Sequence, residues 1–158
     1  MLTRAARLIL PAVWLGLIIG ISLIEAPLKF QAPGITIPLG LGIGRLVFGA
    51  MNIVETVIAA CLLTAVLAGR APWPERILVV VITVVLALKA LVVRPLMQGT
   101  TDAVVAGEST GGSGMHYLYI AADGLLIVGL VALLVLAARA VLGEPSGSPE
   151  RERRPSRS

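Results

Sequence analysis

Charged residues are scarce in this chain, and cysteine and histidine are almost absent. Only 14% of the 158 residues are charged, 57% are hydrophobic, and the mean hydropathy is +0.95. An average soluble domain has about 25% charged and about 45–50% apolar residues. The composition therefore excludes an ordinary soluble fold and indicates a membrane protein.

The single cysteine and the single histidine exclude several kinds of chemistry. Cys61 lies inside an apolar run, so the chain can form no internal disulfide, no C-x-x-C redox pair and no multi-cysteine metal site. His116 alone cannot form a bis-histidine haem site, and a metal site would have to be built from carboxylates. Because the sequence also lacks a G-x-S-x-G nucleophile elbow, it does not favour an enzyme, and we expect no cofactor and no metal.

Long apolar runs are what the sequence has instead. They are Leu8 to Ile24, Leu46 to Leu67, Ile77 to Val93 and Tyr117 to Ala138. About 20 apolar residues in a helix cross a hydrocarbon core of ~30 Å. The sequence therefore predicts an all-α membrane protein, a bundle of four transmembrane helices in one domain. The predicted domain covers residues 1–143, with spans at about 8–25, 45–68, 76–94 and 117–139.

Arginine and lysine are distributed unequally over the two sides of this arrangement. One side holds Arg4, Arg7, Arg70, Arg76, Arg139, Arg151, Arg153, Arg154 and Arg157, and the other holds Lys29, Arg45 and Arg94. Cytoplasmic loops carry an excess of such residues, so we expect both termini on the cytoplasmic side of the inner (plasma) membrane. Since the basic residues flank the spans or lie in the tail, the net charge of +4 does not indicate nucleic-acid binding.

Three segments outside the spans differ in composition. Residues 144–158 are rich in Pro, Ser, Glu and Arg and are predicted to be a disordered basic tail. Residues 26–44 are rich in Pro and Gly but still apolar, so they either re-enter the membrane or lie on its surface. Residues 98–114 are polar and rich in glycine, which predicts a flexible external loop.

Ionisable and polar side chains within or beside the spans are the candidate functional residues. Such groups are costly in a bilayer and usually face the bundle interior or a water-filled cavity. Helical spacing predicts one polar face on the second span and another on the fourth. The candidates for a ligand or ion pathway are Glu25, Arg45, Asn52, Glu55, Lys89, Arg94, His116, Tyr119 and Asp123.

The helix rise of ~1.5 Å per residue gives the relative depths of these groups. Lys89 reaches nearly the depth of Asp123, so the two are predicted to pair. Glu55 lies near the middle of its span, and Lys89 is the basic residue closest to its depth. A second cluster of opposite charges is predicted at the outer ends of the first three spans, from Glu25, Arg45 and Arg94.

Two functional hypotheses follow from this pattern. The nine candidates could line an outward-facing polar site that binds or transports a small polar solute or ion. Alternatively, the charges could neutralise one another and fix helix register in an accessory or assembly subunit. Four short helices enclose little volume, so we expect a homo-oligomer or a larger membrane complex. Gly16 and Gly20 form a G-x-x-x-G pair that could serve packing within the bundle or a dimer interface.

Short sequence patterns resemble those of small bacterial integral membrane proteins with four spans. These patterns are EAPLKFQAPG followed by PLGLGIGRLVF, a third span ending in RP, and HYLYIAAD at the start of the fourth span. The resemblance covers the chain from Trp14 to about Arg139. It implies a four-span architecture but no characterised activity and no functional residues.

Overall fold

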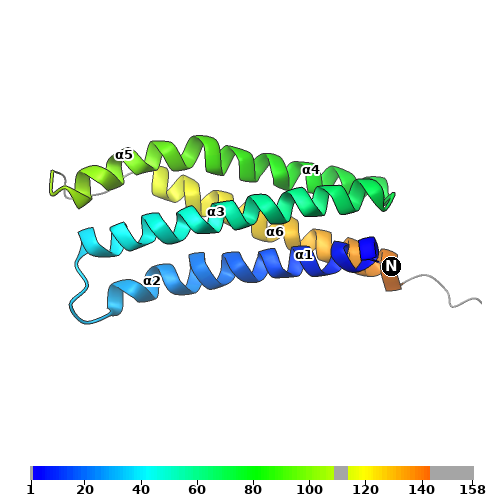
Figure 1. The fold of residues 1–158 in the computed structure, drawn as a ribbon, viewed down its shortest axis with the longest axis horizontal. Helices are drawn as coiled ribbons and strands as arrows, with labels where there is room; N and C mark the ends of the chain where they lie inside the picture. The colour runs from blue at the N-terminus through cyan, green and yellow to red at the C-terminus, as the bar shows by residue number, and fades with distance from the viewer. Residues whose placement is uncertain (1, 109–113, 143–158) are drawn as a thin grey trace, which may run out of the picture.

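The structure is a computed structural model that describes residues 2–108 and 114–142 (Figure 1). The elements are α1 (Leu2–Ile18), η1 (Ile19–Glu25), α2 (Ala26–Leu28), η2 (Lys29–Gln31), α3 (Ile37–Ala68), α4 (Trp73–Leu88), η3 (Lys89–Val93), α5 (Arg94–Val105) and α6 (Gly114–Leu142). The first four are continuous, as are α4, η3 and α5, so the described residues form four long helical segments. All four are long and apolar enough to cross a membrane, which confirms the predicted four-helix bundle.

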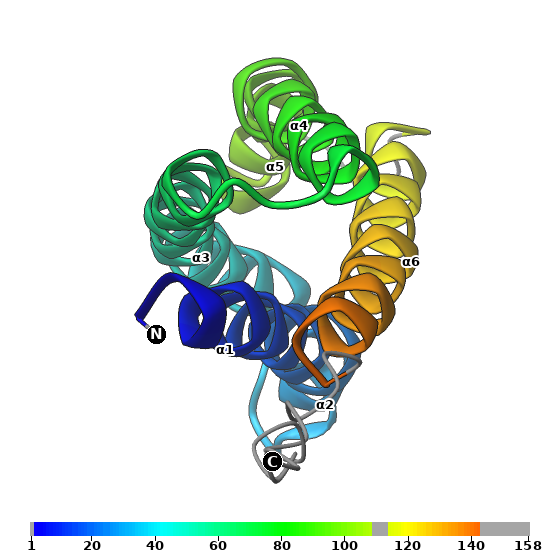
Figure 2. The same cartoon turned by 90° about the vertical axis from the view of Figure 1, so that its right-hand side faces the viewer.

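The four segments run antiparallel to their sequence neighbours and close into a ring. Seen along the bundle, the order around the ring is α1, α3, α4 and α6, and α6 packs beside α1 (Figure 2). The beginning of α1, the turn between α3 and α4, and the end of α6 lie at one end, here called the amino-terminal end (Figure 1). Residues 32–36 and the end of α5 lie at the other end, here called the distal end.

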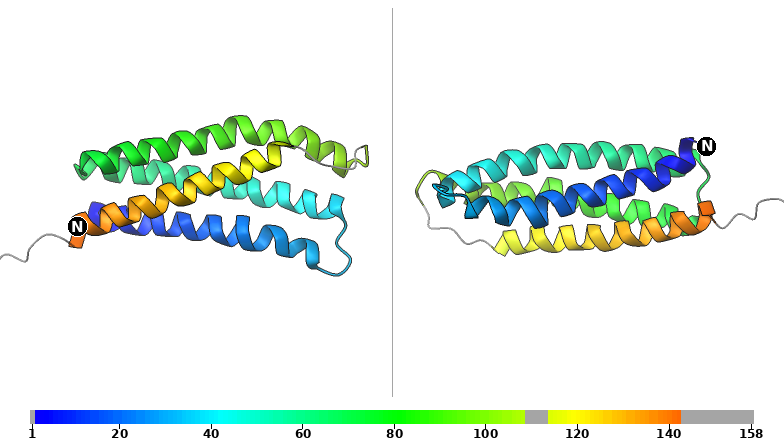
Figure 3. Two further views of the ribbon diagram at one scale, coloured as in Figure 1. Left: turned by 180° about the vertical axis from the view of Figure 1, so that it is seen from behind. Right: turned by 90° about the horizontal axis from the view of Figure 1, so that it is seen from below.

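The segments differ in length at the distal end. The apolar segments Leu2–Gln31, Ile37–Ala68 and Trp73–Val105 contain 30, 32 and 33 residues, whereas His116–Ala140 contains 25. At ~1.5 Å per residue the first three exceed the ~30 Å hydrocarbon core. Helix α6 begins deeper in the bundle than its neighbours end (Figure 3). The longer segments therefore project beyond the first turn of α6.

Local sequence signals explain where the helices begin and end. The Thr36 hydroxyl accepts a hydrogen bond from the Leu39 backbone N–H, 3.4 Å away, and proline occupies the first turn of α3. Helix α3 ends at Ala68; Arg70, two residues later, lies in the left-handed region at φ 49°, and the Ala71 N–H donates to the Val66 carbonyl. Helix α5 ends the same way around Gly107, at φ 78°. Both are Schellman ends, which satisfy the last carbonyls of a helix.

Two π-helical turns interrupt the α-helices, and each ends shortly before a proline. Segment η1 ends two residues before Pro27, and η3 ends two residues before Pro95. A proline within a helix lacks an N–H and leaves an earlier carbonyl without its partner. The chain widens there: the Arg94 N–H donates to the Lys89 carbonyl, five residues earlier. In a π-helical turn, residues five positions apart therefore lie on nearly the same face of the helix. Lys89 and Arg94 thus both point toward the bundle interior.

The hydrophobic core fills the half of the bundle nearer the amino-terminal end. Trp14 and Ile18 from α1 pack with Leu62 and Val66 from α3, with Ile82 from α4, and with side chains of α6. A Cβ at Gly129 would lie 2.5 Å from Ile82 Cγ2, so this glycine permits the close approach of α6 to α4. Burying a large apolar side chain contributes about 1.5–3 kcal/mol against water, but less against lipid, so close packing holds these helices together.

A buried ion pair fixes the amino-terminal end of the bundle. Arg7 of α1 donates two hydrogen bonds to Glu75 in the first turn of α4: Nε to Oε2 at 2.9 Å and Nη2 to Oε1 at 2.6 Å. The two side chains are 8% and 2% exposed. A forked contact of this kind sets both distance and angle between two helices. The pair therefore fixes how α1 and α4 meet.

The structure differs from the sequence prediction in its two distal connections. Helix continues to Gln31 and begins again at Ile37, so only residues 32–36 of the predicted loop 26–44 lie outside helices, and no re-entrant segment forms there. Its glycines are tolerated within α3 because Thr36 and Pro38 provide a strong helix start. Helix α5 likewise covers the predicted external loop as far as Val105. The predicted tail, residues 144–158, lies outside the described residues.

Candidate functional site

Three charged side chains from three helices meet in the centre of the bundle. Lys89 Nζ donates to Glu55 Oε2 at 2.9 Å and Oε1 at 3.2 Å, and to Asp123 Oδ1 at 2.5 Å. Lys89 and Glu55 have no exposed surface, and Asp123 is 3% exposed. The predicted pairing of Lys89 with Asp123 is confirmed, and Lys89 also binds Glu55. These three residues are called the charge cluster below.

Polar and aromatic side chains surround the charge cluster. Trp14 Nε1 donates to Glu55 Oε1 at 3.0 Å, and Ser22 Oγ donates to Asp123 Oδ2 at 2.7 Å. The Lys89 ammonium lies 4.8 Å from the centre of the Tyr119 ring, a cation–π contact. Tyr119 in turn donates from its hydroxyl to Asn52 Oδ1 at 3.4 Å. All four helical segments therefore hold the charge cluster in place.

The charges of the cluster do not balance when all three groups are ionised. Two carboxylates share one ammonium group, which leaves one negative charge in excess. Burying charged groups costs several kcal/mol per ion even after relaxation, and attraction between them offsets this only with good geometry and further hydrogen bonds. Asn52 Nδ2 adds a buried donor that has no partner within the described part of the chain. Such an arrangement is expensive for a group that serves packing alone.

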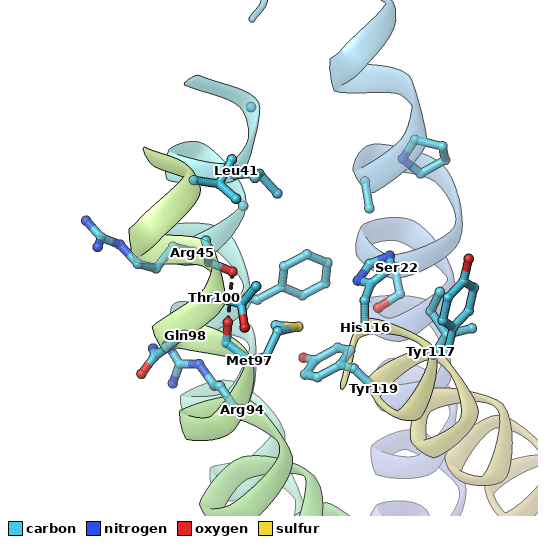
Figure 4. A pocket seen from close by; sticks show the side chains of 18 of the residues that line it. Ser22, Leu41, Arg45, Arg94, Met97, Gln98, Thr100, His116, Tyr117 and Tyr119 are labelled. Carbon is cyan, nitrogen blue, oxygen red and sulfur yellow. Dashed lines mark hydrogen bonds between the residues drawn. The ribbon is translucent and has the colours of Figure 1, made fainter. Parts of the chain in front are cut away.

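A cavity of about 940 Å³ lies directly on the distal side of the charge cluster. Its walls come from all four helical segments: η1 to η2, α3, α5 and α6. Figure 4 shows Ser22 on one side, His116, Tyr117 and Tyr119 from α6 beside it, and Arg94, Met97, Gln98 and Thr100 from α5 facing them. Asp123 belongs both to the cavity wall and to the charge cluster. The floor of the cavity is therefore charged.

Two cations in the cavity wall lie against glycines of α3. A Cβ at Gly49 would lie 2.7 Å from Arg94 Nη2, and a Cβ at Gly44 would lie 3.0 Å from Lys29 Nζ. The absence of side chains at these positions lets the arginine of α5 and the lysine of η2 rest on the α3 backbone. The Lys29 ammonium is also 5.3 Å from the centre of the Phe48 ring.

The three cations of the cavity wall, Lys29, Arg45 and Arg94, differ in their ion pairing. Lys29 Nζ is 3.4 Å from Glu25 Oε2, one helical turn away. Arg45, at the rim, donates to Asp102 on α5 at 2.6 Å, with both side chains about half exposed. Arg94 is partly buried and has neither an ion-pair nor a hydrogen-bond partner among residues 2–108 and 114–142.

The structure brings together most of the candidate residues but not in one layer. The inner layer contains Asn52, Glu55, Lys89, Tyr119 and Asp123, and the cavity wall adds Arg45, Arg94 and His116. The predicted second cluster does not form, because Glu25 turns to Lys29 and Arg45 turns to Asp102. Depth alone placed these groups at one level, but rotation about each helix axis directs them to different neighbours. Glu25 does not line the cavity.

Sequence reasoning missed Trp14, Ser22 and Lys29. The first two continue the buried stripe of α1 at helical spacing, with Ile18 between them. A tryptophan in mid-span needs an acceptor for its N–H, and a serine on the same stripe must face the interior. That signal was present in the sequence. The role of Lys29 was not visible, because it depends on the extension of the first segment through η2.

The arrangement is that of a polytopic membrane protein with a charged site inside a four-helix bundle. Among the described residues no three His, Cys, Asp or Glu side chains come together as a metal-binding group, and the two central carboxylates already hold Lys89. No protein-family model, curated protein or solved structure matches the chain. The function must therefore be argued from the geometry of the site.

Proposed function

We propose that this protein binds a small molecule in the distal cavity and transports it or presents it within the membrane. The observation that supports this most strongly is the position of the cavity. It has about 940 Å³, near the upper end of the ~300–1,000 Å³ typical of ligand sites, and it ends on a buried charge cluster. Charged groups inside a span that reach a cavity are the usual mark of a solute or ion pathway.

Asp123 connects the cavity to two other helical segments, so a ligand in the cavity could change the contacts between helices. Asp123 lines the cavity, accepts from Ser22 of η1 and binds Lys89 of η3. Both η1 and η3 are π-helical turns, which are frequent at functional sites. A ligand that displaced Asp123 would change contacts at both turns, and this coupling could open or close the cavity.

The proposal includes an orientation and an assembly. The excess of arginine at the amino-terminal end favours a cytoplasmic location for that end, so the cavity would open to the outside of the inner (plasma) membrane. Gly16 and Gly20 meet no other side chain: a Cβ at either would have open space around it. A second copy or a larger partner protein could approach closely there.

Replacement of Met97 by tryptophan tests the proposed site. Met97 lines the cavity, and the larger indole is expected to fill it; Leu96→Trp is the matched control, because Leu96 is 58% exposed on the outer face of the same helix. We expect native mass spectrometry of gently extracted protein to find a bound small molecule in wild type and Leu96→Trp. The Met97→Trp variant should retain less than about a tenth of it, a loss of ~1.4 kcal/mol or more in binding, because the indole occupies the space that the ligand needs.

Two other results would contradict the proposal, the first for the site and the second for the binding function. If all three proteins retained the same molecule, the ligand would lie outside the cavity. If none carried a ligand and each ran in a fixed complex with a larger protein, the accessory or assembly role would replace the present proposal. The same spectra report stoichiometry, so they also test the proposed homo-oligomer.

A further inference from the structure

The chemical class of the ligand can be inferred from the charges of the cavity wall. The charged side chains that line it are the cations Lys29, Arg45 and Arg94 and the carboxylate Asp123. Asp123 already binds Lys89, and Arg45 already binds Asp102. Lys29 has a weak partner at 3.4 Å, and Arg94 has none within the described part of the chain. Apart from the negative charge in excess at the charge cluster on the floor, the free charge of the wall is therefore positive.

Arg94 has the position and chemistry of an anion-binding group. Its guanidinium is held against the α3 backbone at Gly49, and Lys29 is held at Gly44 on the same helix. These glycines are five residues apart, or ~7.5 Å along the helix axis. A partly buried guanidinium without a carboxylate is expensive unless an anion completes it, and its planar donors fit a carboxylate or a phosphate.

Besides polar side chains such as Gln98 and Thr100, the wall has a large apolar part that includes exposed residues. Phe30, Phe48, Met97 and Val104 line the cavity beside the two cations. The wall also includes Leu23 of η1 and Ile120 of α6, which are 54% and 50% exposed. Both lie in segments apolar enough to cross the membrane, so this part of the wall would face lipid. The part of the wall between η1 and α6 is called the portal.

We propose that the cavity binds an amphipathic anion: a carboxylate or phosphate head on Arg94, with an apolar tail along the wall toward the portal. This inference rests on the binding function proposed above and specifies its ligand. Lys29 of η2 is a second cation in the same cavity wall. The apolar tail reaches the bilayer through the portal, so the ligand enters laterally from the membrane.

Direct binding of radiolabelled oleate to the full protein in phosphatidylcholine nanodiscs tests the inference, with empty nanodiscs as background. We expect saturable binding to wild type. Arg94→Gln should weaken it about 10- to 100-fold, the range expected for a charge-assisted hydrogen bond. Arg94→Lys should recover part of the affinity. Arg45→Gln is the matched control and should stay within about threefold of wild type, because Arg45 is engaged by Asp102.

A second variant tests the geometry without removing a charge. A Cβ at Gly49 would meet Arg94 Nη2, so Gly49→Ala should displace the guanidinium and weaken oleate binding by severalfold. Gly42→Ala is the matched control on the same helix and should leave oleate binding unchanged, because a Cβ there meets nothing within 4 Å. An equal effect of the two variants would contradict the assigned position of the head group.

Competition experiments identify the source of the anion. Unlabelled oleamide, which has the same tail but no charge, should not displace oleate. Displacement by dioleoylphosphatidic acid would support the inference and identify membrane lipid as a source, whereas displacement by acetate or inorganic phosphate alone would overturn the amphipathic part. Equal competition by oleate and oleamide, or unchanged binding to Arg94→Gln, would overturn the inference.

Failure of this inference can be distinguished from failure of the binding function. A native ligand that Met97→Trp loses but Arg94→Gln retains would leave the cavity as the site and show that the ligand is not held through its charge. If both variants kept the native ligand, both proposals would be contradicted.

Discussion

Replacing Lys89 with methionine is expected to destabilise the protein so strongly that little of it stays folded. The substitution leaves Glu55 and Asp123 buried without their shared cation. Removal of one partner of a buried ion pair costs about 3–5 kcal/mol, which is a large part of the total stability of a small domain. We expect a much lower midpoint of thermal unfolding, measured by size-exclusion chromatography with fluorescence detection after heating in detergent.

Two further variants show whether charge is the cause. Leu88→Met changes an exposed neighbour by a volume-conserving substitution and should unfold close to wild type. The triple variant Glu55→Gln, Lys89→Met, Asp123→Asn removes all three charges and should regain most of the lost stability, because apolar or neutral replacement of a whole buried cluster is tolerated. Unchanged unfolding of Lys89→Met would mean that the two carboxylates are not held by Lys89.

Replacing Arg7 with methionine should also cost about 3–5 kcal/mol. It leaves the Glu75 carboxylate, 1% exposed, without the guanidinium that binds both its oxygens. The expected result is a lower midpoint of thermal unfolding in the same assay. Arg7→Lys should lie between Arg7→Met and wild type, because lysine keeps the charge but cannot make the forked contact.

The double variant Arg7→Met, Glu75→Met is the control for this pair. It removes the unpaired charge and should recover most of the stability lost in Arg7→Met. Arg139→Met changes an exposed arginine at the same end of the bundle and should have little effect. If Arg139→Met and Arg7→Met unfolded alike, net charge at this end would explain the loss rather than the ion pair.

The four spans and the central pairing could be predicted from the sequence for a simple physical reason. In a bilayer, apolar runs of about 20 residues have few alternatives to a spanning helix. Once the spans are assigned, residue number gives depth at ~1.5 Å per residue, and a buried cation needs a partner at its own depth. Lys89, Glu55 and Asp123 met this condition, and the structure brings them together.

The depth of a residue along its helix does not tell in which direction its side chain points around the helix axis. This limits what the sequence predicts about the site. Glu25, Arg45 and Arg94 were correctly assigned to the distal end but have three different environments. The rotation of Arg94 depends on the π turn before Pro95, where five residues instead of four complete a backbone hydrogen bond. A proline in an apolar run signals some distortion but not its form.

The cavity could not be predicted, because it results from helix lengths. Glycine and proline suggested a break after Glu25, but helix continues to Gln31 and restarts at Ile37. These extensions stand beyond the first turn of α6 and form the cavity walls. They also bring Lys29 and Phe48 together, two residues that lie in different predicted segments.

The central claim is that the cavity beside the charge cluster is open at the distal end. Reaction of Ser22→Cys with a hydrophilic, membrane-impermeant thiol reagent tests it most directly, in a Cys61→Ser background because Cys61 is exposed. Ser22 lines the cavity and contacts Asp123, whereas Ile18, one turn deeper, has no exposed surface. Glu108→Cys and Trp73→Cys mark the distal and amino-terminal ends.

In intact cells we expect the reagent to label Ser22→Cys and Glu108→Cys but not Ile18→Cys or Trp73→Cys, and we expect Met97→Trp to slow the reaction of Ser22→Cys. Labelling of Trp73→Cys instead of Glu108→Cys would reverse the proposed orientation. If Ser22→Cys reacted no faster than Ile18→Cys in permeabilised cells, where both ends are accessible, no open cavity would lead to the charge cluster and the account would be contradicted.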